Sequence, residues 1–428
     1  MEIKSLKELQ AVDERTLNFT PLGLGHMRPE DSADFQQRVV AGLRLADDVT
    51  ETTRARFEQL RTAFIHGVLC YELFTLVEDS TRLTLEQALR DRFADYHEDQ
   101  EIEIRDFRGR VRRIPAGDYP EFFRLLRKIR NPEIRMGASQ DWERFNGMLA
   151  GLLTWARREG LLRGQRNRRR DPSRQALRNM VAHGTYHLTT PVDAARSLSD
   201  LAETVNHLWG QPTPDGHLYP GPVKRPVIAI GWSAERAITV MGLADQLADA
   251  HDDIELTYTL VRAVHGDPDL MQFDSRRATT AFPAQYLWGP GTREEALAWM
   301  NRAKPTPDTC DYLDQIVVVR TLDGQVDLPT YPGIAAGLPE EEQTGLWHAV
   351  RVDRPLDALG HIRAVMGGEP GHEPQGECEN CPADTVATGD LTTVLKAVQE
   401  AGADTEPLYV PDLRTPIAAA SPTRFGKR

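Results

Sequence analysis

The spacing of apolar residues divides the chain into a helical first half and a second half with strand-like runs. From about residue 53, apolar side chains recur every three or four positions, as one face of a helix requires. The first members of this face are Phe57, Leu60, Phe64, Val68 and Tyr71. The same spacing continues to Val77 and resumes over Leu83–Leu89. We therefore expect long helices from residue 53 to about residue 90.

A different pattern interrupts the helical region at residues 100–118. Between Glu101 and Arg112, apolar residues alternate with charged ones, and Gly109 stands where a turn would reverse the chain. Alternation of this kind around a glycine predicts a β-hairpin. Helical spacing returns over residues 119–129 and 141–158. The hairpin would therefore be an insertion between helices.

Two further helices of the first half begin at recognisable start signals. Asp171-Pro172-Ser173 resembles a helix start, because proline is favoured in the first helical turn. The following helix would carry Leu177, Met180 and Val181, and Gly184 follows it. Thr190-Pro191 opens another amphipathic segment that ends at Gly210. The first half is thus predicted to be all-α apart from the hairpin.

The period of the apolar residues changes after a segment rich in proline and glycine at residues 211–226, which we interpret as a linker. Val227–Ile230 predicts a strand, residues 233–250 a helix capped by Ser233, and Ile254–Val264 another strand. This strand–helix–strand order indicates an α/β domain. Further along we expect a strand at Ile316–Val319, a loop over 369–390, a helix at Leu391–Ala401 and a last strand at Leu408–Val410.

The predicted organisation is therefore a multidomain chain in four parts. Residues 1–52 form an N-terminal segment with weak signals, and residues 53–210 form an all-α helical bundle that contains an Arg-rich segment at residues 157–178. Residues 211–226 are the linker, and residues 227–428 form the α/β domain. A length of 428 residues agrees with two or three domains.

The charge distribution changes this picture of function. The formal net charge is −13, which by itself argues against a nucleic-acid partner. Residues 1–210 hold 33 basic and 32 acidic residues, whereas residues 211–428 hold 18 and 32, a net of −14. Residues 101–178 carry 20 basic and 10 acidic residues, a net of +10. The first half therefore contains a basic region suited to phosphates, and the acidic second half does not.

One short segment at the end of the basic region combines residues of catalytic type. Arg178 and Asn179 are followed by His183 and Gly184. Of the five Arg–His pairs with similar spacing in the chain, this is the one in which asparagine follows the arginine, and nine arginines lie between Arg157 and Arg178. Histidine transfers protons near neutral pH, and a guanidinium group stabilises negative charge on a phosphate. The segment therefore points to metal-independent cleavage of RNA by attack of the substrate's 2′-hydroxyl.

This arrangement resembles the HEPN superfamily, whose ribonucleases carry an arginine, a polar residue and a histidine at this spacing. The resemblance covers about residues 53–210 and implies an α-helical bundle. It implies that His183 is the acid–base residue, Arg178 the stabiliser of the transition state and Asn179 an orienting group. It also implies a two-fold homodimer that pairs two such helices into a composite site, and a role in host defence or toxin-like growth arrest.

The basic segment before the motif predicts a path for the RNA backbone, because guanidinium groups bind phosphates and such binding weakens with salt. The arginines expected to bind RNA are Arg163, Arg166, Arg168, Arg169, Arg170 and Arg174. Aromatic residues that could stack on bases are scarce here, with only Trp155 nearby. We therefore do not expect base recognition by stacking in this segment.

The cysteines leave two interpretations open. Cys378-Glu-Asn-Cys381 has the spacing of half a zinc site, and His372, His361 and Cys310 could complete it. No second pair of this spacing exists, so the sequence favours two thiols in a loop and no bound metal or other cofactor. Four cysteines make no disulfide framework, and Met1–Gln10 has no signal-peptide core, so we expect a cytoplasmic protein.

The expected function is thus an endoribonuclease with RNA as its partner and a regulatory acidic domain. The trigger sensed by that domain would be a small molecule or a protein. The alternative is a non-catalytic helical module that binds RNA or a partner, coupled to an acidic sensor domain. No run of 18 apolar residues is present, so we expect no membrane partner.

Overall fold

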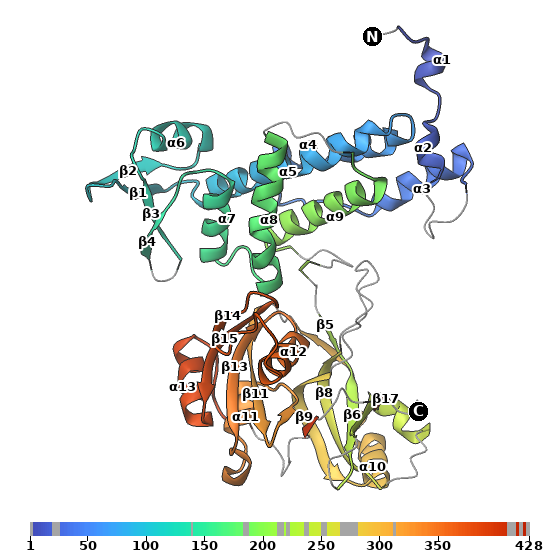
Figure 1. Ribbon diagram of the computed structural model, residues 1–428, viewed down its shortest axis with the longest axis vertical. Coiled ribbons are helices and arrows are strands. Elements are labelled where there is room, and N and C mark those ends of the chain that lie inside the picture. Colours follow the sequence, from blue (N-terminus) through green and yellow to red (C-terminus); the bar gives the residue numbers. More distant parts are fainter. Residues whose placement is uncertain are drawn as a thin grey trace. The chain divides into compact units, whose positions relative to one another are not determined.

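The computed structural model forms two compact units (Figure 1). The first contains Met1–Arg163 and Asn167–Pro220, and the second contains Gly164–Arg166 and Gly221–Arg428. The structure describes residues 3–18, 26–137, 140–182, 188–211, 218–219, 223–234, 239–249, 255–265, 281–310, 314–408, 417–418 and 423–424. Each unit is presented by itself.

The first unit is built mainly from helices, as the apolar spacing predicts. The central helix is α5, which packs against α4, α7 and α9. The helices outside the insertion are α1 (Leu6–Leu9), α2 (Glu14–Leu17), α3 (Pro29–Ala41), α4 (Glu51–Ile65), α5 (Glu72–Tyr96), α7 (Leu149–Arg158), α8 (Gln165–Ala182) and α9 (Pro191–Leu208). Helix α9 begins where Thr190-Pro191 predicts, because the Thr190 side chain accepts the Asp193 N–H as an N-cap.

An aromatic cluster forms the core where α5 meets the inserted region. Phe93 of α5 is fully buried, and its ring lies 4.9 Å from that of Trp155, 5.1 Å from Phe122 and 5.2 Å from Phe145, measured between centroids. Tilted and offset rings at these distances attract one another by about 0.5–1.5 kcal/mol per pair beyond their burial. Trp155 is therefore a core residue and does not present a face to a nucleic acid.

The insertion is a four-stranded antiparallel sheet with one helix. Its strands are β1 (Glu101–Arg105), β2 (Val111–Pro115), β3 (Glu133–Met136) and β4 (Asp141–Arg144), in the order β2-β1-β3-β4, with α6 (Tyr119–Leu126) between β2 and β3 (Figure 1). The predicted hairpin is confirmed as β1–β2. The helix expected over 141–158 is wrong in its first part, because Asp141–Arg144 pairs with β3 and α7 begins only at Leu149.

Helix α8 begins earlier than predicted. It runs over Gln165–Ala182 with Pro172 inside it, whereas the sequence suggests a start at Asp171. Asp171 is buried and forms ion pairs with Arg157 at 3.0 Å and Arg174 at 3.5 Å. These contacts stabilise α8 next to Pro172, and the helix continues through the proline although one backbone donor is lost. The basic segment is therefore largely helical.

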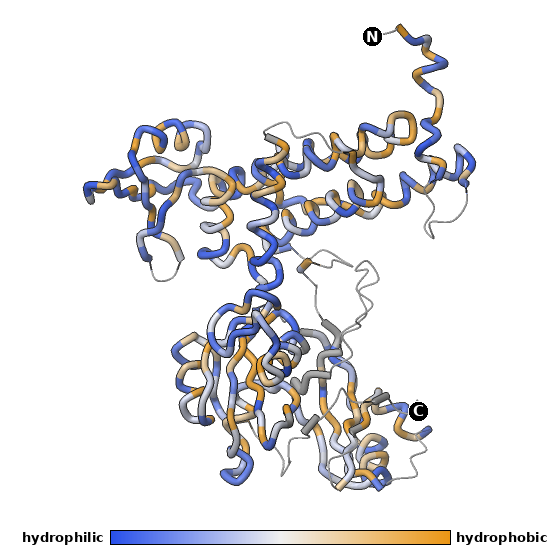
Figure 2. The backbone as a smooth tube through the Cα atoms, in the orientation of Figure 1, coloured by the Kyte–Doolittle hydropathy of each residue, from blue (hydrophilic) through white to orange (hydrophobic). Residues whose placement is uncertain are grey.

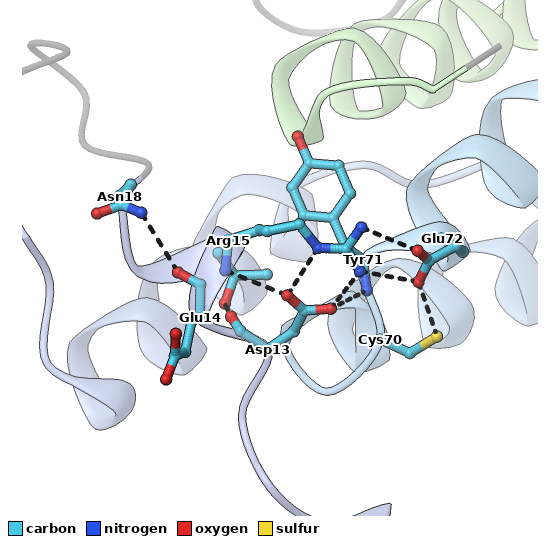
Figure 3. A network of polar contacts seen from close by, with 8 residues as sticks. Asp13, Glu14, Arg15, Asn18, Cys70, Tyr71 and Glu72 are labelled. Carbon is cyan, nitrogen blue, oxygen red and sulfur yellow. Dashed lines mark hydrogen bonds and ion pairs between the residues drawn. The ribbon is translucent and has the colours of Figure 1, made fainter. Parts of the chain in front are cut away.

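The N-terminal residues are attached to the helices by polar contacts (Figure 3). The Asp13 carboxylate accepts the backbone N–H of Tyr71 at 3.1 Å and pairs with Arg15, which also reaches Glu72 at 2.9 Å. Further along, Asn206 of α9 accepts the Ala46 N–H at 2.8 Å and donates to the carbonyl of residue 44 at 2.9 Å. Residues before α4 are thus part of the first unit.

The described residues of the second unit form two larger sheets, in which neighbouring strands are antiparallel except for β17 and β7. One sheet has the order β17-β7-β6-β8-β9 and the other β14-β15-β13-β11-β12-β16. The strands of the first sheet are β6 (Val227–Trp232), β7 (Thr239–Leu243), β8 (Thr257–His265), β9 (Ala281–Gly291) and β17 (Thr423–Arg424). Separately, β5 (Val223–Arg225) pairs with β10 (Asp308–Cys310), and α10 (Arg293–Ala303) packs against β8 and β9.

The predicted helix over residues 233–250 is wrong. Residues 239–243 form β7, which pairs antiparallel with β6, and residues 244–249 form a short 3₁₀ helix. Val240 and Met241 are buried in the sheet, so tertiary packing favours the strand. The strand–helix–strand unit is therefore absent from the described residues of this region. The second unit contains both helices and strands, as expected, but their order along the chain differs from the predicted strand–helix–strand order.

The second sheet is covered by a helix on each face. Its strands are β11 (Gln315–Leu322), β12 (Gln325–Asp327), β13 (Leu346–Val352), β14 (Gly376–Glu377), β15 (Ala383–Gly389) and β16 (Ile417–Ala418). Val317 and Val319 pack with α12 (Pro355–Met366), whereas Ile316 and Val318 pack with α13 (Leu391–Glu400). Burial on both faces explains the unbroken apolar run at Ile316–Val319, and Figure 2 shows these central strands as mainly hydrophobic.

Three other predictions in this unit have different outcomes. The helix at Leu391–Ala401 is confirmed as α13. The loop expected over 369–390 contains β14 and β15, because Gly376 and Glu377 pair with residues of β15 across a short turn. Leu408 is irregular, and Tyr409 and Val410 lie outside the described residues. A short helix α11 (Pro332–Ala336) completes the unit.

Candidate functional site

Helix α8 places Arg178 and Asn179 in its last turns, and α5 supplies a partner for the arginine. Nε and Nη2 of Arg178 lie 2.9 and 2.8 Å from the same carboxylate oxygen of Glu86. The other oxygen of Glu86 accepts from Arg90 at 2.5 Å. The Glu86 side chain is 4% exposed and that of Arg178 is 20% exposed. The carboxylate is thus buried between two guanidinium groups, which compensate its desolvation.

This pair determines what Arg178 can do chemically. Two contacts to one oxygen fix the plane and direction of the guanidinium group. The three charges sum to +1, so the group retains an attraction for an anion. The same contact is also an interaction between α5 and α8 that stabilises the bundle. A substitution of Arg178 therefore affects both roles and needs a control for folding.

The other members of the motif have different environments. Asn179 is exposed, as are Leu177 and Met180 beside it. His183 lies outside the described residues, so the structure places two of the three predicted catalytic residues. On an ideal helix, consecutive residues are about 100° apart, so Arg178 and Asn179 point in different directions.

The arginines predicted to bind RNA differ in their exposure and in their partners. Arg174 is largely buried, where it pairs with Asp171 and donates to the Thr204 hydroxyl at 3.1 Å. Arg170 faces Asp200 at 3.7 Å. Arg163 and Arg168 are exposed, and Arg166 and Arg169 are half-buried. The exposed members are best placed to meet a phosphate backbone, whereas Arg174 packs inside the unit.

A cavity of about 160 Å³ lies among α5, α8 and α9. Arg82 and Glu78 form an ion pair in its wall, and Arg174 and Asp200 are also in the lining. The other lining residues are Thr81, Leu85, Leu149, Leu177, Ser197, Leu201 and Thr204. The wall contains two basic and two acidic side chains, so their charges balance and the cavity has no strong preference for an anion.

An exposed aromatic residue that the apolar pattern does not single out lies at the tip of the β1–β2 hairpin. Phe107 is 50% exposed, and the guanidinium carbons of Arg108 and Arg130 lie 5.2 and 5.1 Å from its ring centroid. The Asp106 carboxylate holds the turn by accepting the N–H groups of Arg108 and Arg110 at 2.9 and 3.0 Å. An exposed ring with two cations nearby suits a nucleobase and its phosphates. The sequence does not predict this role for Phe107, because the residue also fits the alternating apolar pattern of the hairpin.

The cysteine pair lies at the turn between β14 and β15 in the second unit. His361 of α12 and His372 of the following loop lie beside Cys378 and Cys381. The side chain of Cys310, the third candidate ligand, is outside the described residues.

Comparisons with known proteins add nothing to these sites. No family model, no curated protein and no solved structure matches the chain. Among the helices of the described residues, none has both the length and the apolar composition needed to span a bilayer.

Proposed function

We propose that the chain is a metal-independent endoribonuclease whose active residues are Arg178, Asn179 and His183 in the first unit. The observation that carries the proposal is the fixed orientation of Arg178 by buried Glu86, next to exposed Asn179 at the end of α8. A pre-oriented guanidinium group is what the stabilisation of a developing phosphorane charge requires.

The proposed reaction needs no external nucleophile. The substrate's 2′-oxygen bonds to phosphorus while the bond from phosphorus to the 5′-oxygen breaks. A base removes the 2′-hydroxyl proton, and an acid protonates the departing 5′-oxygen, so the products are a 2′,3′-cyclic phosphate and a 5′-hydroxyl. His183 performs one of these transfers, and the second comes from the histidine of a paired copy. Asn179 orients the imidazole or a phosphate oxygen.

The proposed RNA-binding surface combines exposed arginines with the hairpin tip. Arg163 and Arg168 contact phosphates, and Phe107 stacks on a base while nearby Arg108 and Arg130 bind its phosphates. Binding should weaken as salt rises, with a slope of about −0.7 in log–log terms for each phosphate neutralised on single-stranded RNA. Phe107→Ala should lower RNA affinity at every salt concentration without changing that slope.

The proposed assembly is a homodimer in the cytoplasm, with the second unit sensing a small molecule or a protein that controls cleavage. Exposed Leu177 and Met180 lie three residues apart on α8, and this apolar stripe supports contact with the same helix of a second copy. A role in host defence or growth arrest follows from the resemblance to HEPN ribonucleases.

The first test compares wild type with His183→Ala and Asn179→Ala on total RNA, with no divalent cation added. We expect cyclic-phosphate ends from wild type, and we expect His183→Ala to cleave about 10²–10⁴-fold more slowly because it lacks the acid–base group. His26→Ala is the matched control, because His26 is an exposed histidine of the same unit. Cleavage by His183→Ala at the wild-type rate would refute the proposal.

The second test separates the two roles of Arg178. Arg178→Ala leaves the Glu86 carboxylate buried with one partner, whereas the double variant Arg178→Ala/Glu86→Gln removes that charge as well. We expect the double variant to fold and to remain inactive. If the double variant cleaved RNA as wild type does, Arg178 would have only a structural role.

The alternative is that the first unit binds RNA or a partner without cutting it. The exposed ring of Phe107, with Arg108 and Arg130 nearby, favours this candidate because it would serve binding alone. It predicts that wild type retains RNA and yields no new ends, and that Phe107→Ala or Arg130→Ala reduces retention.

A further inference from the structure

We propose that His361, His372, Cys378 and Cys381 bind one Zn²⁺ ion in the second unit. One ligand atom from each residue lies within 4.8 Å of every other, and the four come from three separate elements. Two thiolates and two imidazoles are a ligand set that zinc takes in tetrahedral structural sites.

The distances between ligand atoms fit a tetrahedron around zinc. With Zn–S near 2.3 Å and Zn–N near 2.0–2.1 Å, a sulfur and a nitrogen on neighbouring corners lie about 3.5 Å apart. Nδ1 of His372 is 3.5 Å from Cys378 Sγ and 3.7 Å from Cys381 Sγ. Nδ1 of His361 is 3.1 Å from Cys381 Sγ. Small movements of the histidines would therefore complete the coordination.

The cysteines are held by a tight turn between two strands. The Cys378 N–H donates to the carbonyl of Ala383 at 2.9 Å, and the Ala383 N–H donates to the carbonyl of Cys381 at 2.8 Å. Glu377 and Asp384 pair where β14 meets β15. This closed turn directs both sulfurs to the same side, which is the arrangement that a shared metal requires.

The loop that carries His372 is held onto the same turn. Asn380 stands between the two cysteines and donates to the carbonyl of Pro370 at 3.0 Å. The φ of Gly371 is +78°, and a Cβ at this position would overlap the amide nitrogen of Asn380. A side chain at Gly371 would be strained at this φ and would displace the Asn380 amide, so glycine lets the loop bring His372 to the sulfurs.

A hydrogen-bond partner orients the remaining ligand. Nε2 of His361 lies 3.1 Å from the hydroxyl of Thr385, which is buried in β15. Metal-binding histidines commonly donate their second ring N–H to such an acceptor, which fixes the tautomer and the direction of the ring. With Nε2 occupied by Thr385, Nδ1 is the atom that faces Cys381.

Burial identifies the type of site. Cys378 and His361 are buried, and Cys381 and His372 are half-buried. Four protein ligands leave no position for a substrate, so the ion would be structural. Two thiolates balance the charge of Zn²⁺, so the buried group would be neutral. The ion would join α12 to the β14–β15 turn, and this role is independent of the proposed ribonuclease activity.

The test measures metal bound to the full-length protein. Purified wild type should hold about one zinc ion per chain by elemental mass spectrometry, and Co²⁺ in its place should give the visible absorption of a tetrahedral site with sulfur ligands. Cys381→Ser and His372→Ala should lose the metal, whereas His372→Cys should retain it by replacing nitrogen with sulfur. Thr385→Ala should weaken affinity about 10-fold or more.

Cys70→Ser is the matched control, because Cys70 is an exposed cysteine of the first unit, and it should keep full zinc content. Circular dichroism should be used to check that each variant is folded. The proposal fails if metal-free wild type, given Zn²⁺ under reducing conditions, binds none. It also fails if Cys381→Ser binds zinc as wild type does, or if Cys378 and Cys381 are found joined as a disulfide in the protein as purified.

Discussion

The candidate sites of the two units differ in how their residues are distributed along the chain. Arg178 and Asn179 are adjacent in sequence, so the motif is evident from the amino-acid sequence alone. The four proposed zinc ligands extend over residues 361–381 and come from a helix, a loop and a strand turn. In the structure, Arg178 of the motif also forms an ion pair with Glu86, which is a structural contact. The cysteine pair, which is weak evidence for a metal site in the sequence, gains His361 and His372 as further proposed ligands. Residue identity suggests chemistry, but only the neighbours decide whether a group is committed elsewhere.

The largest expected effect is on the second unit alone. Removal of zinc should destabilise α12 and β15 by several kcal/mol, because metal-binding free energy contributes directly to folding. Hydrogen exchange followed by mass spectrometry should show faster exchange in these elements after chelation, with α5 unchanged. If chelation accelerated hydrogen exchange equally in α5, the stabilising effect of zinc would not be confined to the second unit.

Buried ion pairs allow the next comparison between the units. Arg320 and Asp327 of the second unit lie 2.5 Å apart, with side chains 4% and 2% exposed. Arg320→Ala should cost about 3–5 kcal/mol of unfolding free energy, because it leaves a buried carboxylate uncompensated. Arg178→Ala should cost less, about 2–3 kcal/mol, because Arg90 remains beside Glu86.

Denaturant unfolding of each variant provides the measurement. The control is Arg38→Ala, which removes an exposed pair with Asp34 and should cost under about 1 kcal/mol. A loss for Arg178→Ala as small as that of the control would show that the Glu86 contact contributes little to the bundle.

A smaller effect concerns the pH dependence of the first unit. Burial, with Arg163 and Arg157 nearby, lowers the pKa of His207 to about 4, and its ring stacks on Tyr219 with centroids 3.8 Å apart. Above pH 6.5 the imidazole is neutral in both states. As pH falls below 6.5, the unfolded chain binds a proton that the folded unit does not, so stability decreases toward pH 4 by about 1–3 kcal/mol.

His207→Gln should flatten this decrease, and His26→Gln, at an exposed position, should not. The midpoint of thermal unfolding from pH 7 to pH 4 is the measurement. An unchanged pH profile for His207→Gln would assign the acid sensitivity to other groups.

The helices of the first unit could be predicted because their apolar spacing is long and regular, as in α4 and α9. The hairpin β1–β2 could also be predicted from the sequence, since Gly109 marks its turn. Strands β4 and β7 were missed because they form through pairing with β3 and β6, which no local pattern records. Pro172 predicts a helix start, but α8 continues through it, and Asp171 pairs there with Arg157 of α7 as well as with nearby Arg174.

The candidate sites show the same limit. Arg178 was identified from its neighbours in sequence, but Glu86 is 92 residues away and has no signal of its own. His361 and His372 were among the open candidates for zinc, yet their selection depends on Thr385, Asn380 and the turn at Ala383. These contacts depend on tertiary structure.

The amide of Asn206 has a practical consequence for dissecting the protein. Its two hydrogen bonds reach residues 44 and 46, which precede the first long helix of the bundle. A truncated protein that starts at residue 53 would leave this amide, which is almost fully buried, without those bonds and would expose the α9 surface that α3 contacts. Expression of the first unit should therefore begin near residue 3 and extend to residue 220, so that poor yield from shorter versions is not mistaken for toxicity of an active nuclease.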